Sequence, residues 1–252
     1  VGHWKLDDGS GQTAGDSSGN GNSGTLVNGP SWTTGKNGGG LRFDGVNDYV
    51  QVANSGSLSP QALTVALWMN ASTFANANWN SMLVNKGMNE WENGYYGLAV
   101  RTDGTLATML NIGGGSANAF YLSSPAVTAG QWQHVAMTYD NSRLRLYVNG
   151  TKVNELLVSR SRTSNTANLI MGRRGDAGYF FNGVLDDVQV HAQALSDADI
   201  VALAGGGTPP PPPPGTYQAS ADFSGVQGQR GWYYRDSLGR LMTFDAAINR
   251  WQ

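Results

Sequence analysis

The chain has 252 residues with 40% hydrophobic content, enough to bury a sizeable core, while only 13% of its residues are charged. The formal net charge of −2 gives no electrostatic case for a nucleic acid partner, and no stretch approaches the roughly 20 apolar residues of a membrane span. The absence of cysteine excludes disulfides and thiolate metal sites. The chain opens at Val1 without Met or an apolar leader, so we expect a portion of a longer, exported protein.

Strand-like segments follow one another through the first four fifths of the chain. They combine alternation with β-branched or aromatic residues and are separated by turns rich in Gly, Asn and Asp. The expected strands are Leu41–Phe43, Tyr49–Val52, Leu63–Met69, Ser81–Val84, Tyr95–Val100, Thr105–Ile112, Trp132–Tyr139, Arg143–Val148, Thr151–Leu157, Leu169–Met171 and Val184–His191. So many short strands predict one large all-β, antiparallel sandwich.

Two local signals are sharper than the rest. Asn149-Gly150 lies between two alternating segments and predicts a type I′ hairpin, since both residues tolerate positive φ. The one expected helix is Ser196–Ala204. Ser196 stands three residues before Asp199 in a capping-box arrangement, and Gly205 follows as a stop signal.

A proline-rich stretch divides the chain. Six prolines, Pro209–Pro214, favour an extended polyproline helix that acts as a semi-rigid spacer, typical of extracellular multi-domain proteins. The tail after it is too short for an independent core, although Gly231–Tyr234 and Leu241–Phe244 could form a β-hairpin. We therefore expect a domain at 1–205, a Pro/Gly linker at 206–215, and an incomplete module or docking segment at 216–252.

Five segments carry a family resemblance. They are Trp4–Gly29, Leu41–Val52, Leu63–Ser72, Trp132–Gly150 and Gly183–Leu203. In this order they resemble bacterial laminin-G-like, concanavalin A-like lectin modules over about residues 1–205. The resemblance implies an antiparallel two-sheet jelly roll whose first and last strands lie side by side. It also implies a carbohydrate-binding or adhesive role in secreted proteins, often beside polysaccharide-degrading enzymes, and in many members a structural calcium ion.

The calcium prediction rests on a glycine-rich loop, 16–24, with oxygen-bearing side chains at alternate positions. Val188 and Val190 of the closing strand are expected to face the core, which would turn Asp186 the same way and require a partner for its carboxylate. The resemblance brings the loop against this strand. The proposed calcium ligands are Asp16, Asn20, Asn22 and Asp186. The alternative is an Asx-rich turn plus an Asp hydrogen-bonded to backbone amides.

Aromatic residues outside the regular alternation indicate a ligand site. Trp68 and Trp132 match strand positions and are expected in the core, whereas two loop-like segments, 74–96 and 173–181, place aromatic residues among polar ones. The predicted ligand contacts are Trp79, Trp91, Tyr179, Arg173 and Arg174. The two arginines would suit a carboxylated or sulfated sugar, or they form a solvated basic turn. Arg-Gly-Asp at 174–176 also spells an integrin-type tripeptide.

Catalysis has little support in the sequence. The Glu-x-Asp-x-x-Glu strand of the glucanases that share this fold is absent, and the nearest carboxylate pair, Glu90 and Glu92, has no third member. His134 and Tyr139 are five residues apart on one strand and so face opposite ways. We expect a non-catalytic, secreted or cell-surface module that binds a polysaccharide. An adhesive protein-binding module is the alternative, followed by a jelly-roll glycanase or lyase.

Overall fold

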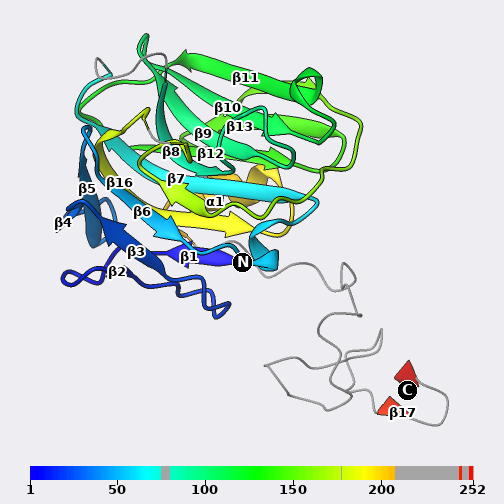
Figure 1. Ribbon diagram of the computed structural model, residues 1–252, viewed down its shortest axis with the longest axis horizontal. Coiled ribbons are helices and arrows are strands. Elements are labelled where there is room, and N and C mark those ends of the chain that lie inside the picture. The colour runs from blue at the N-terminus through cyan, green and yellow to red at the C-terminus, as the bar shows by residue number, and fades with distance from the viewer. Residues whose placement is uncertain (75–79, 177, 208–243, 246–249, 252) are drawn as a thin grey trace. The chain divides into compact units, whose positions relative to one another are not determined.

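The computed structural model describes residues 1–74, 80–176, 178–207, 244–245 and 250–251. The chain divides into two compact units, Val1–Pro209 and Pro210–Gln252. The first unit contains two sheets of eight strands each and one short helix (Figure 1). In the second unit, the described residues form an antiparallel strand pair, β17 (Phe244–Asp245) and β18 (Arg250–Trp251). The predicted tail hairpin lies outside the described residues except at Phe244, which pairs with Trp251.

Sheet A follows the order β14-β13-β12-β7-β16-β5-β4, with β1 also paired to β16. Its strands are β1 (Gly2–Trp4), β4 (Ser31–Thr34), β5 (Gly39–Asp44), β7 (Leu63–Ala71), β12 (Gln133–Tyr139), β13 (Arg143–Val148), β14 (Thr151–Leu157) and β16 (Asn182–His191). The antiparallel pairing of β1 with β16 aligns Gly2 with Val190. The implied side-by-side placement of the first and last strands is therefore confirmed.

Sheet B follows the order β11-β10-β9-β8-β15-β6-β3-β2. Its strands are β2 (Thr13–Ala14), β3 (Gly24–Val27), β6 (Tyr49–Val52), β8 (Asn80–Lys86), β9 (Tyr96–Arg101), β10 (Thr105–Asn111), β11 (Ala119–Ala126) and β15 (Leu169–Met171). Two 3₁₀ turns, Gly56–Leu58 and Ser116–Asn118, lie in the connections. All strand pairs in both sheets are antiparallel, so the predicted two-sheet sandwich is confirmed.

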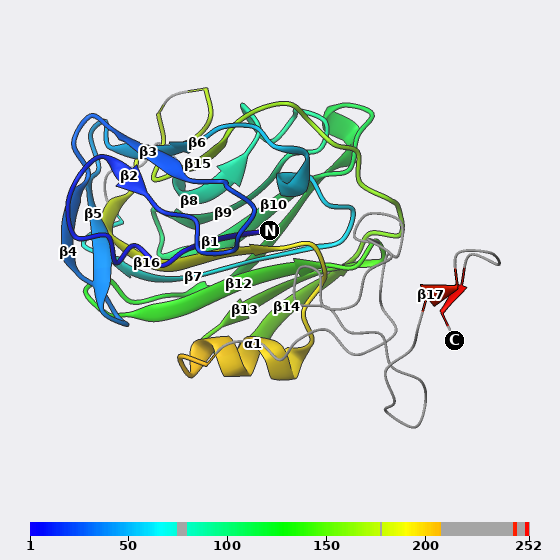
Figure 2. The same cartoon turned by 90° about the horizontal axis from the view of Figure 1, so that it is seen from below.

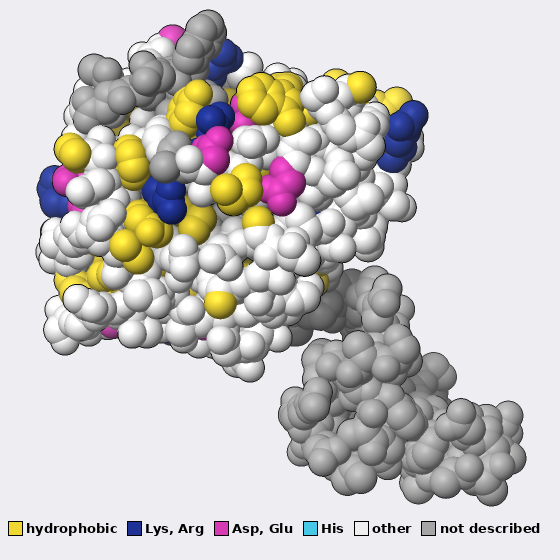
Figure 3. All heavy atoms as spheres, viewed as in Figure 1, with side chains coloured by type: hydrophobic (Ala, Val, Ile, Leu, Met, Phe, Trp, Pro, Cys, Tyr) yellow, Lys and Arg dark blue, Asp and Glu magenta, His cyan; other side chains and the backbone are white. Residues whose placement is uncertain are grey.

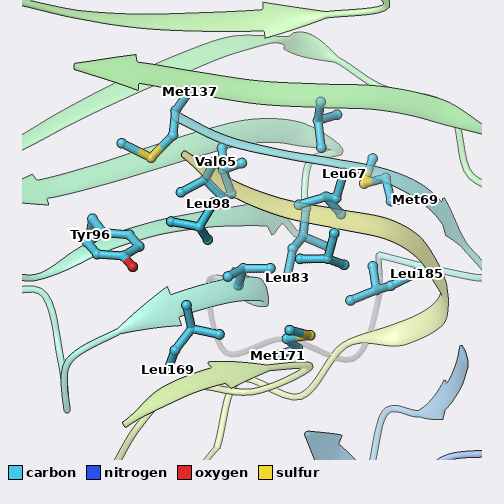
Figure 4. Packing of buried hydrophobic residues seen from close by; sticks show 14 of the residues in the cluster. Val65, Leu67, Met69, Leu83, Tyr96, Leu98, Met137, Leu169, Met171 and Leu185 are labelled. Atoms are coloured by element: carbon cyan, nitrogen blue, oxygen red, sulfur yellow. The ribbon is translucent and has the colours of Figure 1, made fainter. Parts of the chain in front are cut away.

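The core lies between the two sheets. Figure 4 shows Val65, Leu67 and Met69 of β7 and Met137 of β12 on one side of it, with side chains of β8, β9 and β15 opposite. Alternate residues of each strand point into this layer, as period-two geometry requires. Each fully buried aliphatic side chain contributes roughly 1.5–3 kcal/mol of transfer free energy, which makes this layer the main source of stability.

The helix α1 (Asp197–Ala204) covers the outer face of sheet A (Figure 2). Ile200 and Leu203 of the helix pack with Ala66, Ala136 and Tyr147 of the sheet in a cluster separate from the core. The predicted capping box is present, because the Ser196 side chain accepts from the Asp199 N–H and the Asp199 carboxylate accepts in return. The predicted hairpin is present too, with φ of 49° at Asn149 and 80° at Gly150.

Candidate functional site

The outer face of sheet B carries a hollow of about 460 Å³. On β10, Leu106 and Leu110 belong to the core between the sheets, so Ala107 and Met109 point to the opposite face. The hollow is lined by Glu90, Trp91, Arg101, Ala107, Met109, Tyr121, Leu122, Ser123 and Tyr179. Figure 3 looks onto sheet B and shows hydrophobic side chains gathered among acidic and basic ones on this face.

Met109, which lines the hollow, belongs to a small buried cluster with Met82, Tyr95 and Ala99, against which Tyr179 packs. Tyr95 is fully buried, and burial holds the pKa of its hydroxyl well above the usual value, so it stays protonated. This hydroxyl has no hydrogen-bond partner among the described residues.

Two loops form the rim of the hollow: the first loop, 87–95, joins β8 to β9, and the second loop, 172–181, joins β15 to β16. Backbone hydrogen bonds tie the second loop to the first loop and to β8. The Asp176 N–H donates to the Met88 carbonyl at 3.0 Å, and the Met82 N–H donates to the Tyr179 carbonyl at 2.9 Å. Gly175 lies so close to the other loop that a Cβ there would stand 2.1 Å from the Gly87 oxygen. Tyr179 itself has a φ of 57°, an uncommon value for a bulky residue. Backbone contacts therefore hold the rim in place.

Arg174 joins the charged and aromatic parts of the rim. Its guanidinium stacks on the Tyr179 ring at 3.9 Å, pairs with both Asp176 oxygens at 2.7 and 3.0 Å, and reaches Glu90 at 3.2 Å. The Arg174 guanidinium thus contacts the carboxylates of Asp176 and Glu90 and the ring of Tyr179. Arg174 is therefore a positioning residue for Tyr179 and Glu90. The expectation that it contacts a sugar directly has no support in this arrangement.

Two aromatic side chains remain open to solvent at the hollow. Trp91, from the first loop, is 54% exposed, and Tyr121, from β11, is 52% exposed. Large aromatic rings left half in water beside a concave surface are costly unless something covers them, and they offer a ligand a flat apolar face. With Tyr179 they form an aromatic rim around the hollow.

The structure brings together part of the predicted contact set. Trp91 and Tyr179, from separate predicted loops, line one hollow, with Arg174 directly against Tyr179. Arg173 turns away and stacks on Tyr49 at 3.9 Å, while Trp79 lies outside the described residues.

Sequence reasoning did not single out six of the lining residues: Arg101, Ala107, Met109, Tyr121, Leu122 and Ser123. The period-two alternation of 119–124 was the one signal that could have placed Tyr121 and Ser123 on the outer face.

The carboxylates of the first loop do not form a catalytic pair. Glu90 is the one carboxylate among the residues that line the hollow, and Arg174 neutralises it. The Glu92 carboxylate instead accepts from the Met88 N–H. Glycosidase chemistry needs two carboxyl groups on either side of the scissile bond, and this hollow presents a single, paired one.

His134 and Tyr139 face opposite ways, as predicted. Tyr139 lies in the core between the sheets and its hydroxyl donates to the Val158 carbonyl at 3.0 Å. His134 lies on the outer face of sheet A, edge-on to Trp68 with ring centroids 5.4 Å apart, and burial lowers its pKa to about 4. Trp68 is buried as predicted, but on this outer face, whereas Trp132 is only partly buried.

The loop residues proposed as calcium ligands satisfy one another. The Asp16 carboxylate accepts from the backbone N–H groups of His3, Ser18 and Asn22 at 2.8 to 3.0 Å. The buried Asn22 amide donates to the Val1 carbonyl, while the exposed Asn20 amide donates to the Ser18 hydroxyl. These contacts lower the pKa of Asp16 against the opposing effect of burial, and they match the Asx-rich turn that was the alternative.

Asp186 does not join that loop. A β-bulge interrupts the register of β16 between Asp186 and Gln189, so Asp186 and Val188 do not share a face. The inference that Asp186 faces the core is therefore wrong: Leu185 does, and Asp186 is buried on the outer side, where its Oδ2 accepts from the N–H groups of Lys36 and Asn37 at 2.7 and 2.8 Å.

β1 lies between the two acids, because it pairs with β16 along one edge and bridges to Asp16 through Trp4 along the other. Within the described part of the chain, no three His, Asp or Glu side chains are grouped to hold a metal ion. The four proposed ligands therefore do not fit one calcium cage.

The sequence belongs to a known family. The model of the family Laminin_G_3, the concanavalin A-like lectin/glucanases superfamily, matches residues 43–201, well over half of the chain. The chain is therefore a member of this superfamily, as the sequence motifs indicated. A search of curated proteins found no match. In the described ranges, no helix is long and apolar enough to cross a bilayer.

Several solved structures share the fold. Domain 4 of AbnA, an extracellular GH43 arabinanase from Geobacillus stearothermophilus determined with arabinotriose, is 19% identical with a TM-score of 0.64, over 81% of this chain and 97% of that domain. The binding domain of Paraclostridial Mosquitocidal Protein 1 is 18% identical with a TM-score of 0.61, over 76% of this chain. The receptor binding domain of botulinum neurotoxin D is 15% identical with a TM-score of 0.61, over 82% of this chain. This chain spans 49% and 52% of those two toxin domains.

Proposed function

We propose that this chain is a non-catalytic carbohydrate-binding module of a secreted multi-domain protein, and that it binds a polysaccharide in the hollow on sheet B. The observation that carries the proposal is the pair of half-exposed rings, Trp91 and Tyr121, that line a hollow on the outer face of sheet B. Sugar rings have apolar C–H faces that stack on aromatic side chains, while the hydroxyls at their edges need polar partners such as Ser123 and Glu90.

The comparisons support a binding role. An arabinanase domain of the same fold was solved with arabinotriose, which favours a sugar ligand. Two toxin domains of this fold are described as binding or receptor-binding domains, which keeps a protein partner as the second candidate. The Arg-Gly-Asp tripeptide gives that candidate little support, because Arg174 and Asp176 pair with each other at 2.7 and 3.0 Å.

The proline-rich linker supports a place in a larger protein. Six consecutive prolines are typical of spacers between the modules of larger proteins. A module that binds the polymer raises the local concentration of substrate for any enzyme joined to it. We therefore assign the chain a tethering role outside the cell.

Affinity electrophoresis tests the proposal. The whole chain is run through gels that contain neutral or acidic polysaccharides, beside the variants Trp91→Ala and Met88→Ala. Met88 is an exposed hydrophobic residue of the same loop but does not line the hollow, which makes it the matched control. Loss of a stacking Trp should weaken binding by roughly tenfold or more, since truncated Trp anchors typically cost about 2 kcal/mol or more.

The wild type and Met88→Ala should be retarded by at least one polymer, and Trp91→Ala should migrate as it does in a polymer-free gel. Because the carboxylates of Asp16 and Asp186 each accept from backbone N–H groups and do not lie in one cage, the retardation should persist in chelator. Normal migration of the wild type in every gel would favour the protein-binding alternative, and shortening of the polymer would show an enzyme.

A further inference from the structure

The hollow on sheet B has a second, chemically different end. Leu98 and Val100 of β9 point into the core, so Arg101 at the end of that strand points to the outer face and lines the hollow. Val100 aligns with Leu106 and Gly97 aligns with Met109. Arg101 therefore lies four residues along the sheet from the level of Met109, or about 14 Å at roughly 3.4 Å per residue.

Tyr121 marks the aromatic end, because it aligns with Met109 in the neighbouring pair of strands. An extended sugar chain lying along the strands would meet the aromatic rings at one end and Arg101 at the other.

Arg101 is the cation at this end of the hollow. Its side chain forms no hydrogen bond or ion pair with any residue in the described part of the chain. The nearest acid in sequence, Asp103, accepts from the backbone and hydroxyl of Thr105 at 2.9 and 2.7 Å. These hydrogen bonds lower the pKa of the Asp103 carboxyl, and the Arg101 charge adds to this effect without forming an ion pair. A guanidinium presents several N–H donors in a planar fork suited to carboxylate or sulfate, and here no described residue accepts from them.

The other charges at the hollow are already paired. Arg174 is held between Glu90 and Asp176, so neither the cation nor these carboxylates is free to select a charged ligand. The predicted role of the 173–174 pair in binding an acidic sugar thus passes to Arg101, which sequence reasoning did not single out.

We infer that the hollow selects an acidic polysaccharide, with Arg101 binding a uronate carboxylate or sulfate while the aromatic rim stacks on a neighbouring sugar ring. This inference rests on the proposed function and names the ligand class for the same site. It requires an anionic substituent at a fixed position along the chain, because the aromatic rim and the cation are held on one rigid sheet.

The test compares polymers that differ only in charge. Affinity electrophoresis is run with polygalacturonate and its fully methyl-esterified form, and with a sulfated galactan and its desulfated form. The proteins are the wild type, Arg101→Gln and Arg42→Gln. Arg42 is an exposed arginine of β5 on sheet A and has no ion pair among the described residues, so it controls for the loss of one positive charge.

At least one acidic polymer should retard the wild type about tenfold more strongly than its neutral counterpart. Arg101→Gln should lose this preference, whereas Arg42→Gln should keep it. The preference should also weaken as salt is added, because the contact is solvent-exposed.

Equal retardation by acidic and neutral forms, retardation by neutral polymers alone, or an unchanged preference in Arg101→Gln would overturn the inference and leave the proposed function standing. Absence of retardation by every polymer, including the neutral panel, would overturn both.

Discussion

Each outer face of the sandwich has a pair of neighbouring alanines, but the two faces differ in what covers that pair. On sheet A, Ala66 and Ala136 are direct cross-strand neighbours, and on sheet B, Ala99 and Ala107 are. All four are buried, and small side chains at such positions leave space above the sheet. On sheet A the helix α1 fills that space with Ile200 and Leu203. On sheet B the loops do not cover this alanine pair completely, and Ala107 forms part of the wall of the hollow.

The comparison teaches where this chain derives stability and where it offers binding. Ile200 and Leu203 of α1 are covered by the protein itself, so their burial contributes to the free energy of unfolding. The rings of Trp91 and Tyr121 are more than half exposed, so they contribute little to folding and remain available to a ligand. The same sandwich thus has a closed face and an open one.

Truncation on the closed face should have the largest effect. Ile200 is fully buried, and replacing it by Ala should cost about 2–4 kcal/mol of unfolding free energy through lost burial and a cavity. Trp91→Ala should change that free energy by no more than about 0.5 kcal/mol. Urea unfolding followed by circular dichroism measures both. Equal costs for the two variants would break the distinction between the faces.

The closed face also contains a buried carboxyl group, Asp186, whose titration should make the stability of the protein depend on pH. Burial raises the pKa of the Asp186 carboxyl to about 6, and the charges of Asp187 and Asp7 add to the rise, although two backbone N–H groups oppose it. The folded protein then binds this proton more tightly than the unfolded chain does. The stability that protonation contributes is therefore present at low pH and is lost as the pH rises towards and through about 6.

Asp186→Asn should remove this dependence. The variant should gain stability relative to the wild type by about 1–3 kcal/mol between pH 4 and pH 8, because each pKa unit corresponds to about 1.4 kcal/mol. Unfolding free energies of both proteins over that range provide the measurement, and taking their difference cancels the other carboxylates. A difference that does not change with pH would show that Asp186 titrates normally. Polysaccharide retardation should be the same in both proteins, since the hollow lies on the other sheet.

The alternation of apolar and polar residues in the strands, together with local turn and helix-capping signals, predicted most of the fold. The central strands alternate or are continuously apolar, the Asn149-Gly150 turn has a single favoured geometry, and Ser196 with Asp199 fixes the start of the helix. Strand β11 was missed because it is an edge strand whose exposed residues and Pro125 weaken the strand signal.

The site was less accessible to such reasoning. Trp91 and Tyr179 were found because both interrupt the alternation, yet adjacent Arg173 and Arg174 stack on different rings, Tyr49 and Tyr179. Nothing in the local sequence separates two such neighbours. The bulge in β16 likewise made the prediction for Asp186 wrong. One extra residue between Asp186 and Gln189 places Asp186 on the opposite face from the one that alternation with Val188 predicts.

The most direct test of the site on sheet B is to fill the hollow with a larger side chain. Ala107→Leu places three more carbon atoms in the wall of the hollow without disturbing the core, since Ala107 points away from it. We expect an unfolding midpoint within a few degrees of the wild type and no retardation by a polymer that retards the wild type. A stable Ala107→Leu protein that binds the polymer as strongly as the wild type would place the ligand elsewhere and contradict the account.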